Sequence, residues 1–151
     1  RDHLRVSLSV TNTGDADFSY EEALHTYLAV SDVARISLEG LDGCSYVDKV
    51  DGGDQVQAGP VRFTGETDRL YSHTGDVVVD DPDWSRRIRV SKEGSAITVV
   101  WNPGAARGAA MGDVAQHWAG FVCVEAANTG DRMVTIPSGG THTLTQTLQL
   151  V

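Results

Sequence analysis

The chain has 151 residues and a formal net charge of −9 with histidine neutral, because 21 acidic residues outnumber 12 lysines and arginines. Nucleic acids and anionic membranes bind to positively charged protein surfaces, so we expect neither as a partner. The length is sufficient for one domain with a hydrophobic core. No apolar run approaches the roughly 20 residues that a membrane-spanning helix needs.

Short runs of alternating apolar and polar residues follow one another along the chain, with turn residues between them. No long helical period interrupts this pattern, which predicts an all-β sandwich or barrel. The expected strands are residues 3–11, 18–30, 33–38, 61–64, 68–72, 77–79, 87–90, 97–101, 121–126, 133–136 and 141–151. One face of the first strand is apolar, and it is formed by Leu4, Val6, Leu8 and Val10.

Two segments are expected to be loops rather than strands. Residues 46–57 are polar and glycine-rich, with Asp51-Gly52-Gly53-Asp54 at their centre. Residues 102–113 contain a proline and three glycines, and one helical turn is expected within residues 111–116. Loops of this length in a compact domain often carry function.

The cysteines and histidines do not form a recognisable metal motif. Cys44 and Cys123 lie far apart and outside any CxxC pattern, so we expect two free thiols in a reducing compartment such as the cytoplasm. No HxH or HExxH spacing is present. The histidines are scattered at positions 3, 25, 73, 117 and 142. We therefore predict no metal site.

Glu125 stands out because it lies in the run 121–126, which is otherwise apolar on both faces. The pattern predicts that its carboxylate is at least partly buried. Burial of a carboxylate is costly unless the group has a partner or a raised pKa. A carboxylate with a raised pKa is a candidate general base. The alternative, which the residues alone favour, is that Glu125 turns out to solvent at the end of the strand.

His25 shares one face of an expected strand with Ala23 and Tyr27. Both faces of this segment are largely apolar, so we do not expect the imidazole to be freely solvated. Considered alone, His25 is better interpreted as a hydrogen-bonded core histidine. The functional alternative is a proton donor, since imidazole titrates near neutral pH.

Alternation places Asp68 and Leu70 on one face of their strand and Arg69 and Tyr71 on the other. Arg69 is expected to pair across strands. Asp68 is either a surface carboxylate or an acceptor of hydrogen bonds from a polar ligand.

Two groups of charged residues remain. The segment Tyr46-Val47-Asp48-Lys49 lies on an expected loop, and we interpret it as solvated. The second group is Arg86, Arg87 and Arg89. Alternation places Arg87 and Arg89 on an exposed face opposite Ile88 and Val90, and a solvated face is the favoured interpretation. A phosphate clamp remains the alternative, because the guanidinium fork matches phosphate oxygens.

Six short motifs occur in one order along most of the chain. They are Ala23-Leu24-His25-Thr26-Tyr27, Gly40-Leu41-Asp42-Gly43 with Tyr46-Val47-Asp48-Lys49, Glu66-Thr67-Asp68-Arg69-Leu70-Tyr71, Val100-Trp101-Asn102-Pro103, Met111-Gly112-Asp113 and Val122-Cys123-Val124-Glu125. Together they resemble the glucose-6-phosphate 1-epimerases, or D-hexose-6-phosphate mutarotases, a branch of the aldose 1-epimerase superfamily.

The resemblance implies an all-β fold, a β-supersandwich like that of galactose mutarotase, of which residues 1–151 would be a single C-terminal portion. It implies that His25 is the catalytic acid, that Glu125 is the catalytic base, and that Asp68 contacts sugar hydroxyls. The implied substrate is a hexose 6-phosphate or a related sugar, without a cofactor. If His25 and Glu125 lie close together, each should favour the charged form of the other and so counter the burial penalty.

The chain departs from the family pattern at three points. Ala126 stands where proline commonly follows the CVE motif, and Gly104 stands where a bulky residue commonly follows Trp-Asn-Pro. The chain also corresponds only to about the C-terminal half of a family member. An N-terminal half of the same fold is therefore an expected partner, and we expect the residues that bind the phosphate to lie there.

Two other functions remain open from the sequence, a non-catalytic carbohydrate-binding sandwich and a purely structural β-domain. An enzyme of the implied kind requires His25 and Glu125 to converge on one concavity, whereas a binding protein requires only the concavity.

Overall fold

The structure is a computed structural model that describes residues 2–151. The strands are β1 (His3–Thr11), β2 (Phe18–Tyr20), β3 (Glu22–Leu24), β4 (Tyr27–Ala29), β5 (Ser37–Glu39), β6 (Ser45–Asp48), β7 (Asp54–Val56), β8 (Thr67–Ser72), β9 (Val77–Asp81), β10 (Arg86–Glu93), β11 (Ile97–Asn102), β12 (Phe121–Asn128), β13 (Val134–Ile136) and β14 (Thr141–Leu150). The helices are α1 (Gly104–Ala110) and two 3-10 helices, η1 (Ala115–Gly120) and η2 (Gly130–Arg132). Among the described residues, no helix is long and apolar enough to cross a membrane.

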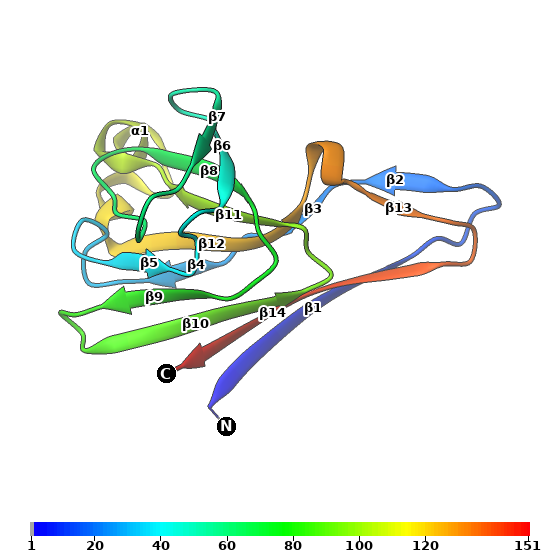
Figure 1. Ribbon diagram of the computed structural model, residues 1–151, viewed down its shortest axis with the longest axis horizontal. Helices are drawn as coiled ribbons and strands as arrows, with labels where there is room; N and C mark the ends of the chain where they lie inside the picture. Colours follow the sequence, from blue (N-terminus) through cyan, green and yellow to red (C-terminus); the bar gives the residue numbers. More distant parts are fainter. Residues whose placement is uncertain (1) are drawn as a thin grey trace.

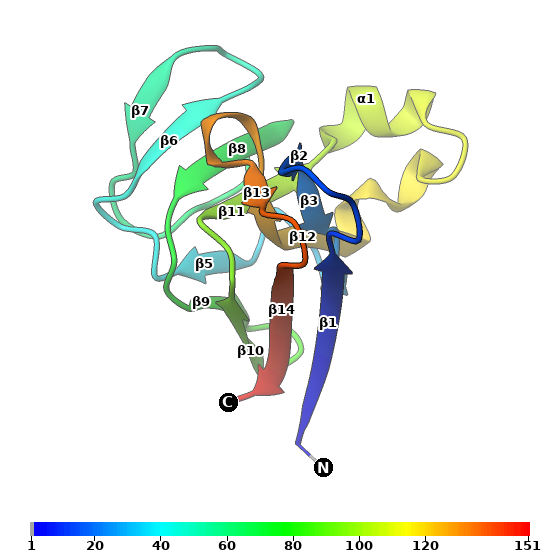
Figure 2. The ribbon, with the colours of Figure 1, turned by 90° about the vertical axis from the view of Figure 1, so that its right-hand side faces the viewer.

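The strands form antiparallel sheets, which confirms the all-β prediction. One sheet has the order β1-β14-β10-β9-β5. The second has the order β3-β12-β11-β8-β6-β7, with β4 also paired to β12, and a small third sheet joins β13 to β2. Figures 1 and 2 show the β9–β10 part of the first sheet lying against the β11–β12 part of the second.

The hydrophobic core lies between these two sheets. Val79 on β9 and Leu38 on β5 are fully buried on one side, and Val100, Val122 and Val124 are buried on the other. The alternation of β12 therefore turns Val122 and Val124 toward the core. The same alternation turns Glu125 to the opposite face of the sheet, away from the core.

Several expected strand boundaries were wrong. Residues 18–30 form the three short strands β2, β3 and β4, because the chain bends between them. Within residues 33–38 only the end belongs to a strand, β5. Residues 61–64 form no strand, and Val61 makes only an isolated bridge to Leu38.

Both segments that we expected to be loops contain regular structure. Residues 46–57 include the hairpin of β6 and β7, and the turn between these strands contains Gly52 and Gly53 with φ of 80° and 88°. Residues 102–113 contain helix α1, and the 3-10 helix η1 follows it. The strand β6 pairs with β8, and this pairing places Asp48 opposite Arg69.

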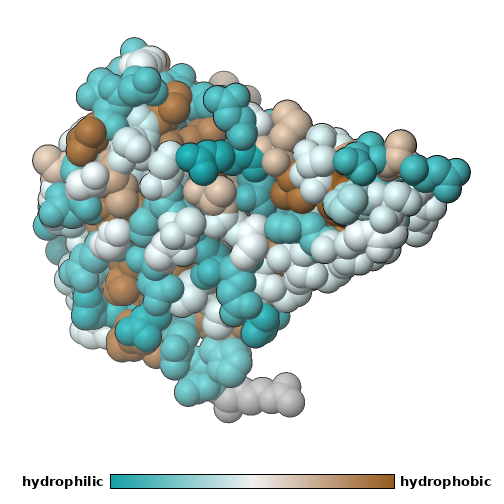
Figure 3. All heavy atoms as spheres, turned by 45° about the vertical axis from the view of Figure 1, so that its right-hand side comes forward, coloured by the Kyte–Doolittle hydropathy of each residue, from teal (hydrophilic) through white to brown (hydrophobic). Residues whose placement is uncertain are grey.

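Strand β1 lies at one edge of the first sheet and pairs with β14 along its whole length (Figure 1). One face of β1 carries hydroxyl groups that bond across to β14, in the pairs Ser7–Thr145, Ser9–Thr143 and Thr11–Thr141. In Figure 3 the tapering arm beyond the body of the molecule is mostly near-neutral in hydropathy. The other face of β1 is apolar, and Leu4, Val6 and Leu8 are all exposed on it.

Candidate active site

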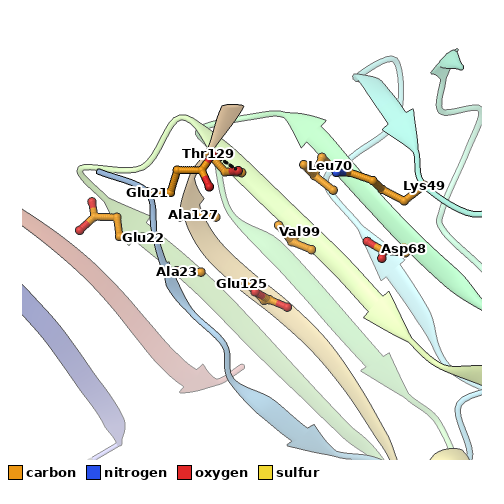
Figure 4. A pocket seen from close by; sticks show the side chains of 10 residues that line it. All are labelled: Glu21, Glu22, Ala23, Lys49, Asp68, Leu70, Val99, Glu125, Ala127 and Thr129. Carbon is orange, nitrogen blue, oxygen red and sulfur yellow. Dashed lines mark hydrogen bonds between the residues drawn. The ribbon is translucent and has the colours of Figure 1, made fainter. Parts of the chain in front are cut away.

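Strands β8, β11 and β12 place one row of side chains on the outer face of the second sheet. Val99 on β11 pairs with Glu125 on β12 and with Leu70 on β8, so these three side chains are neighbours. They lie in a cavity of about 400 Å³, which we call the Glu125 hollow (Figure 4). Its lining residues are Glu21, Glu22, Ala23, Lys49, Asp68, Leu70, Val99, Glu125, Ala127 and Thr129.

Glu125 is 4% exposed, so the strand-end interpretation that the residues alone favoured was wrong, and the burial indicated by its apolar neighbours is confirmed. Its Oε1 lies 3.3 Å from Nε2 of His25. Burial raises the pKa of Glu125 to about 7, and the negative charge of Asp68 contributes to the same shift. The expectation that the carboxylate has a partner or a raised pKa is therefore confirmed on both counts.

The expectation that His25 would counter the burial penalty of Glu125 was wrong for the carboxylate. The pKa of Glu125 is raised because burial removes the carboxylate from water, and the negative charge of Asp68 adds to this shift. As a result, both protonation states of Glu125 are populated near neutral pH. A pKa near the working pH is the value best suited to a general base.

His25 lies in the bend between β3, which ends at Leu24, and β4, which begins at Tyr27. Its side chain is 47% exposed, so the interpretation as a core histidine was wrong. The imidazole stacks on Tyr27 with ring centres 4.9 Å apart and meets the edge of Trp101 at 5.6 Å. These two rings and Glu125 hold the imidazole at the side of the Glu125 hollow.

Asp68 faces the Glu125 hollow together with Leu70, as alternation along β8 predicted. Burial raises the pKa of Asp68. On the other face of β8, Nε of Arg69 lies 3.2 Å from Oδ2 of Asp48, which confirms the expected cross-strand pair. The structure thus brings all three predicted site residues, His25, Glu125 and Asp68, to one side of one sheet.

Sequence analysis missed that Lys49 belongs to this site. Its side chain lines the Glu125 hollow, and its backbone N–H donates to the carbonyl oxygen of Asp68 at 2.8 Å. The interpretation of residues 46–49 as a solvated loop was wrong for residues 46–48, which lie in β6, because the pairing of β6 with β8 was not expected; Lys49 itself is exposed. No signal in the sequence pattern indicated that pairing.

Cys123 is a second residue whose proximity to the site the sequence did not indicate. The possible ligand atoms of His25, Cys123 and Glu125 all lie within 4.8 Å of one another. Imidazole, thiolate and carboxylate are all zinc ligands. However, burial raises the pKa of the Cys123 thiol, which opposes formation of the thiolate that a metal requires. We assign no metal to this cluster. Cys123 and Cys44 are both free thiols, as predicted.

The arginines on β10 that could form a phosphate clamp already pair with carboxylates of this chain. Arg87 lies 2.5 Å from Glu39 and 3.4 Å from Asp80, and Arg89 lies 3.8 Å from Asp76. These exposed ion pairs favour the interpretation as a solvated face.

A comparison with protein families identifies the family of this chain. The family model described as aldose 1-epimerase matches residues 1–149. The chain belongs to the aldose 1-epimerase family.

Two relatives and one solved structure show the extent of the similarity. Proteins named "Putative glucose-6-phosphate 1-epimerase" from Cenchrus ciliaris and Escherichia coli are 32% and 35% identical, over 85% and 83% of this chain. A solved structure from Salmonella typhimurium, titled as a putative mutarotase, has 29% identity and a TM-score of 0.89 over 99% of this chain. The chain spans only 40% and 44% of the two relatives' lengths and 50% of the solved chain.

Proposed function

We propose that this aldose 1-epimerase family member interconverts the α and β anomers of hexose 6-phosphates, as a glucose-6-phosphate 1-epimerase. The observation that supports this most is the 3.3 Å contact between His25 and the buried Glu125 at the edge of the hollow that also contains Asp68. The names of the two relatives suggest the class of substrate.

Anomer exchange requires two proton transfers at one carbon. Glu125 removes the proton from the C1 hydroxyl while His25 gives a proton to the ring oxygen, and the bond between C1 and the ring oxygen breaks. The open-chain aldehyde rotates about the C1–C2 bond. Reverse transfer of both protons then closes the ring on the other face of C1.

The arrangement of the pair suits this reaction. The two oxygens that exchange protons are bonded to the same carbon, so their acid and base must lie side by side, as His25 and Glu125 do. Each positioned proton transfer typically accelerates a reaction about 10²- to 10⁴-fold. Asp68 would accept hydrogen bonds from ring hydroxyls and so hold C1 near Glu125.

The complete catalytic unit would contain more than residues 1–151, since the relatives are about twice as long. We propose that another half of the same fold covers the exposed apolar face formed by Leu4, Val6 and Leu8. Covering such a face removes apolar surface from water, which stabilises the association.

The proposed function is tested by polarimetry on the complete natural polypeptide that carries this sequence. Pure α-glucose 6-phosphate is dissolved, and the decay of optical rotation is followed. The wild type should accelerate the decay, and His25→Ala and Glu125→Gln should each abolish most of the acceleration.

Matched controls remove the same groups from exposed positions far from the hollow. His3→Ala and Glu93→Gln should keep the wild-type rate, because both residues lie on the first sheet. Decay at the buffer rate in the wild type, with the sugar phosphate nevertheless bound, would contradict the enzyme and support a carbohydrate-binding protein.

A further inference from the structure

Gln146 is a buried polar residue in the row of β14 side chains that faces the core. Its neighbours in this row are Leu144, which is fully buried, and Leu148, which packs against the core. Gln146 itself is only 1% exposed. A buried amide costs free energy unless its hydrogen bonds are made, so its position in an apolar row indicates specific partners.

The side-chain amide of Gln146 joins two segments of the other sheet. Its Nε2 donates to the carbonyl oxygen of Val124 at 2.9 Å, and its Oε1 accepts a hydrogen bond from the hydroxyl of Thr26. Val124 directly precedes Glu125 in β12, and Thr26 directly follows His25 in the bend between β3 and β4. We call this pair of hydrogen bonds the Gln146 bridge. It connects the backbone beside one member of the acid–base pair to the segment that carries the other.

The bridge lies where the pairing along β12 is interrupted. Strand β12 pairs with β3 through residues 126–128 and with β4 through residues 121–123. Both stretches have the same register, so a continuous ladder would place His25 opposite Glu125. Residues that lie opposite each other in an antiparallel pair have their side chains on the same face of the sheet. The register therefore explains why the two side chains meet on the outer face.

Instead of a continuous ladder, the chain makes a tight turn centred on His25. The backbone N–H of Thr26 donates to the carbonyl oxygen of Leu24 at 3.0 Å, which is the hydrogen bond of a γ-turn. With its N–H directed to Leu24, Thr26 is connected to β12 through its hydroxyl and Gln146. The position of the bend relative to β12 thus depends on one buried amide.

We propose that Gln146 is a positioning residue, whose bridge from Thr26 to β12 fixes the place of His25 beside the buried base. Stacking against Tyr27 and Trp101 orients the imidazole ring, whereas the bridge sets the separation of the bend from β12. The proposal rests on the proposed function for its catalytic consequence, because proton transfer depends on the place of the acid. A misplacement of about 1 Å in an active site can lower a rate by about 10²-fold.

The two partners require an amide at this position. The carbonyl oxygen of Val124 only accepts and needs an N–H donor, while the hydroxyl of Thr26 donates to an oxygen. Methionine has a similar length and shape but supplies neither group. Gln146→Met therefore removes the bridge and leaves the space filled. Thr26→Val removes the other end of the same bridge, and valine has nearly the shape of threonine.

Anomer exchange of glucose 6-phosphate in the complete natural polypeptide tests the catalytic consequence. We expect kcat to fall by about 10²-fold in Gln146→Met and to fall also in Thr26→Val, with a smaller change in KM because the lining of the Glu125 hollow is kept. The double variant should lose little more than the worse single variant, since both remove one bridge. Thr26→Ser, which supplies the hydroxyl again, should recover the rate that Thr26→Val loses.

Gln149→Met is the matched control, because it removes the same amide from the same strand. Alternation along β14 places Gln149 on the face opposite to that of Gln146. Its kcat should equal that of the wild type. A wild-type kcat in both Gln146→Met and Thr26→Val, or an equal fall in Gln149→Met, would overturn the positioning role.

Amide hydrogen exchange tests the bridge without catalysis. The Thr26 amide should exchange about 10-fold faster in Gln146→Met and in Thr26→Val, since the bend opens more often. The Val100 amide, on β11 between β8 and β12, should be unchanged, which separates local opening from general loosening of the fold. Thr26→Val supplies the same measurement if Gln146→Met does not fold.

The two experiments separate the bridge from the proposed function. Faster exchange at Thr26 alone, in a protein whose wild type turns over no sugar, would support the bridge and contradict the proposed function. Unchanged exchange at Thr26 in both variants, or equally faster exchange at Val100, would overturn the bridge whatever the activity.

Discussion

At the scale of single residues, Glu125 and His25 show which properties of a site can be predicted from a sequence pattern and which cannot. The apolar residues on both faces of its strand indicated the burial of Glu125, but the residues alone still favoured a position facing solvent at the strand end. Its partner was not predictable from the pattern, because His25 is 100 positions away and lies in a bend that alternation cannot place. The resemblance to a known family named the pair, and the structure shows the contact of 3.3 Å.

The raised pKa of Glu125 predicts the pH dependence of catalysis. A general base must be ionised, and the pKa of Glu125 is raised to about 7 by burial. We expect kcat/KM for anomer exchange to fall as the pH is lowered through about 7. The profile is measured between pH 5 and 8 against the buffer rate. A profile that stays flat down to pH 5 would contradict the assignment of Glu125 as the base.

The same shift predicts that Glu125→Gln stabilises the fold at alkaline pH. The folded-state pKa of about 7 exceeds the ordinary value of 4.5, so the folded state holds the proton more tightly than the unfolded state. The wild type therefore loses stability as pH rises from about 4.5 to about 7, and the loss is complete above that window.

Glutamine is neutral at every pH and avoids this loss. Glu125→Gln should unfold with a free energy higher by on the order of 2 kcal/mol at pH 8 and nearly unchanged at pH 4. Urea unfolding at both pH values measures the difference. A variant that is less stable than the wild type at pH 8 would show that the contact with His25 outweighs the burial penalty.

At the scale of secondary-structure elements, predictability followed the apolar pattern of the residues. Strands β1, β10 and β14 were expected because apolar and polar side chains alternate along them, and β12 was expected from its nearly continuous apolar run. Strand β7 was not, since all three of its residues are exposed and leave no alternation. Helix α1 was missed because its seven residues are mainly alanine and glycine, which give no apolar period.

The departure from the family pattern at Gly104 has a local structural reason. Gly104 begins α1 with φ of 64°, and a Cβ atom at this position would lie 2.6 Å from the backbone nitrogen of Glu66. Only glycine fits without movement of the backbone. Because Glu66 directly precedes β8, this close approach connects α1 to the strand that carries Asp68.

Gly104→Ala should therefore lower both stability and activity. We expect a loss of about 2 kcal/mol in the free energy of unfolding, from the positive φ together with the close contact. The value of kcat/KM should also fall, since β8 would shift with Asp68. Gly112→Ala is the control, because no heavy atom lies within 4 Å of its ideal Cβ and its φ is not positive. Equal stability of the two variants would contradict this explanation.

At the scale of the whole molecule, the fold class was predictable from the repeated strand pattern. The pairing of strands that lie far apart in sequence, such as β1 with β14, was not, since alternation says nothing about neighbours. Alternation did place the apolar face of β1. It could not show that this face is exposed, with Leu4, Val6 and Leu8 uncovered within residues 2–151.

This exposed face predicts that the 151-residue chain self-associates when purified alone. Exposed apolar surface on an edge strand favours association between copies. Val6→Lys places a charge in the middle of the apolar face and should increase the fraction of monomer in sedimentation velocity. Ser9→Lys adds the same charge on the hydroxyl-bearing face and should change association less. If both variants behave like the wild type, the apolar face of β1 is not the surface involved.

The central claim is that His25 and Glu125 act as one acid–base pair in anomer exchange. Its most direct test is the exchange rate of glucose 6-phosphate anomers, measured by nuclear magnetic resonance in the complete natural polypeptide for the wild type, His25→Ala, Glu125→Gln and the double variant. Each single variant should lose about 10²- to 10⁴-fold, and the double variant should lose little more than the worse single variant. Exchange at the buffer rate in the wild type, or losses that multiply in the double variant, would contradict the claim.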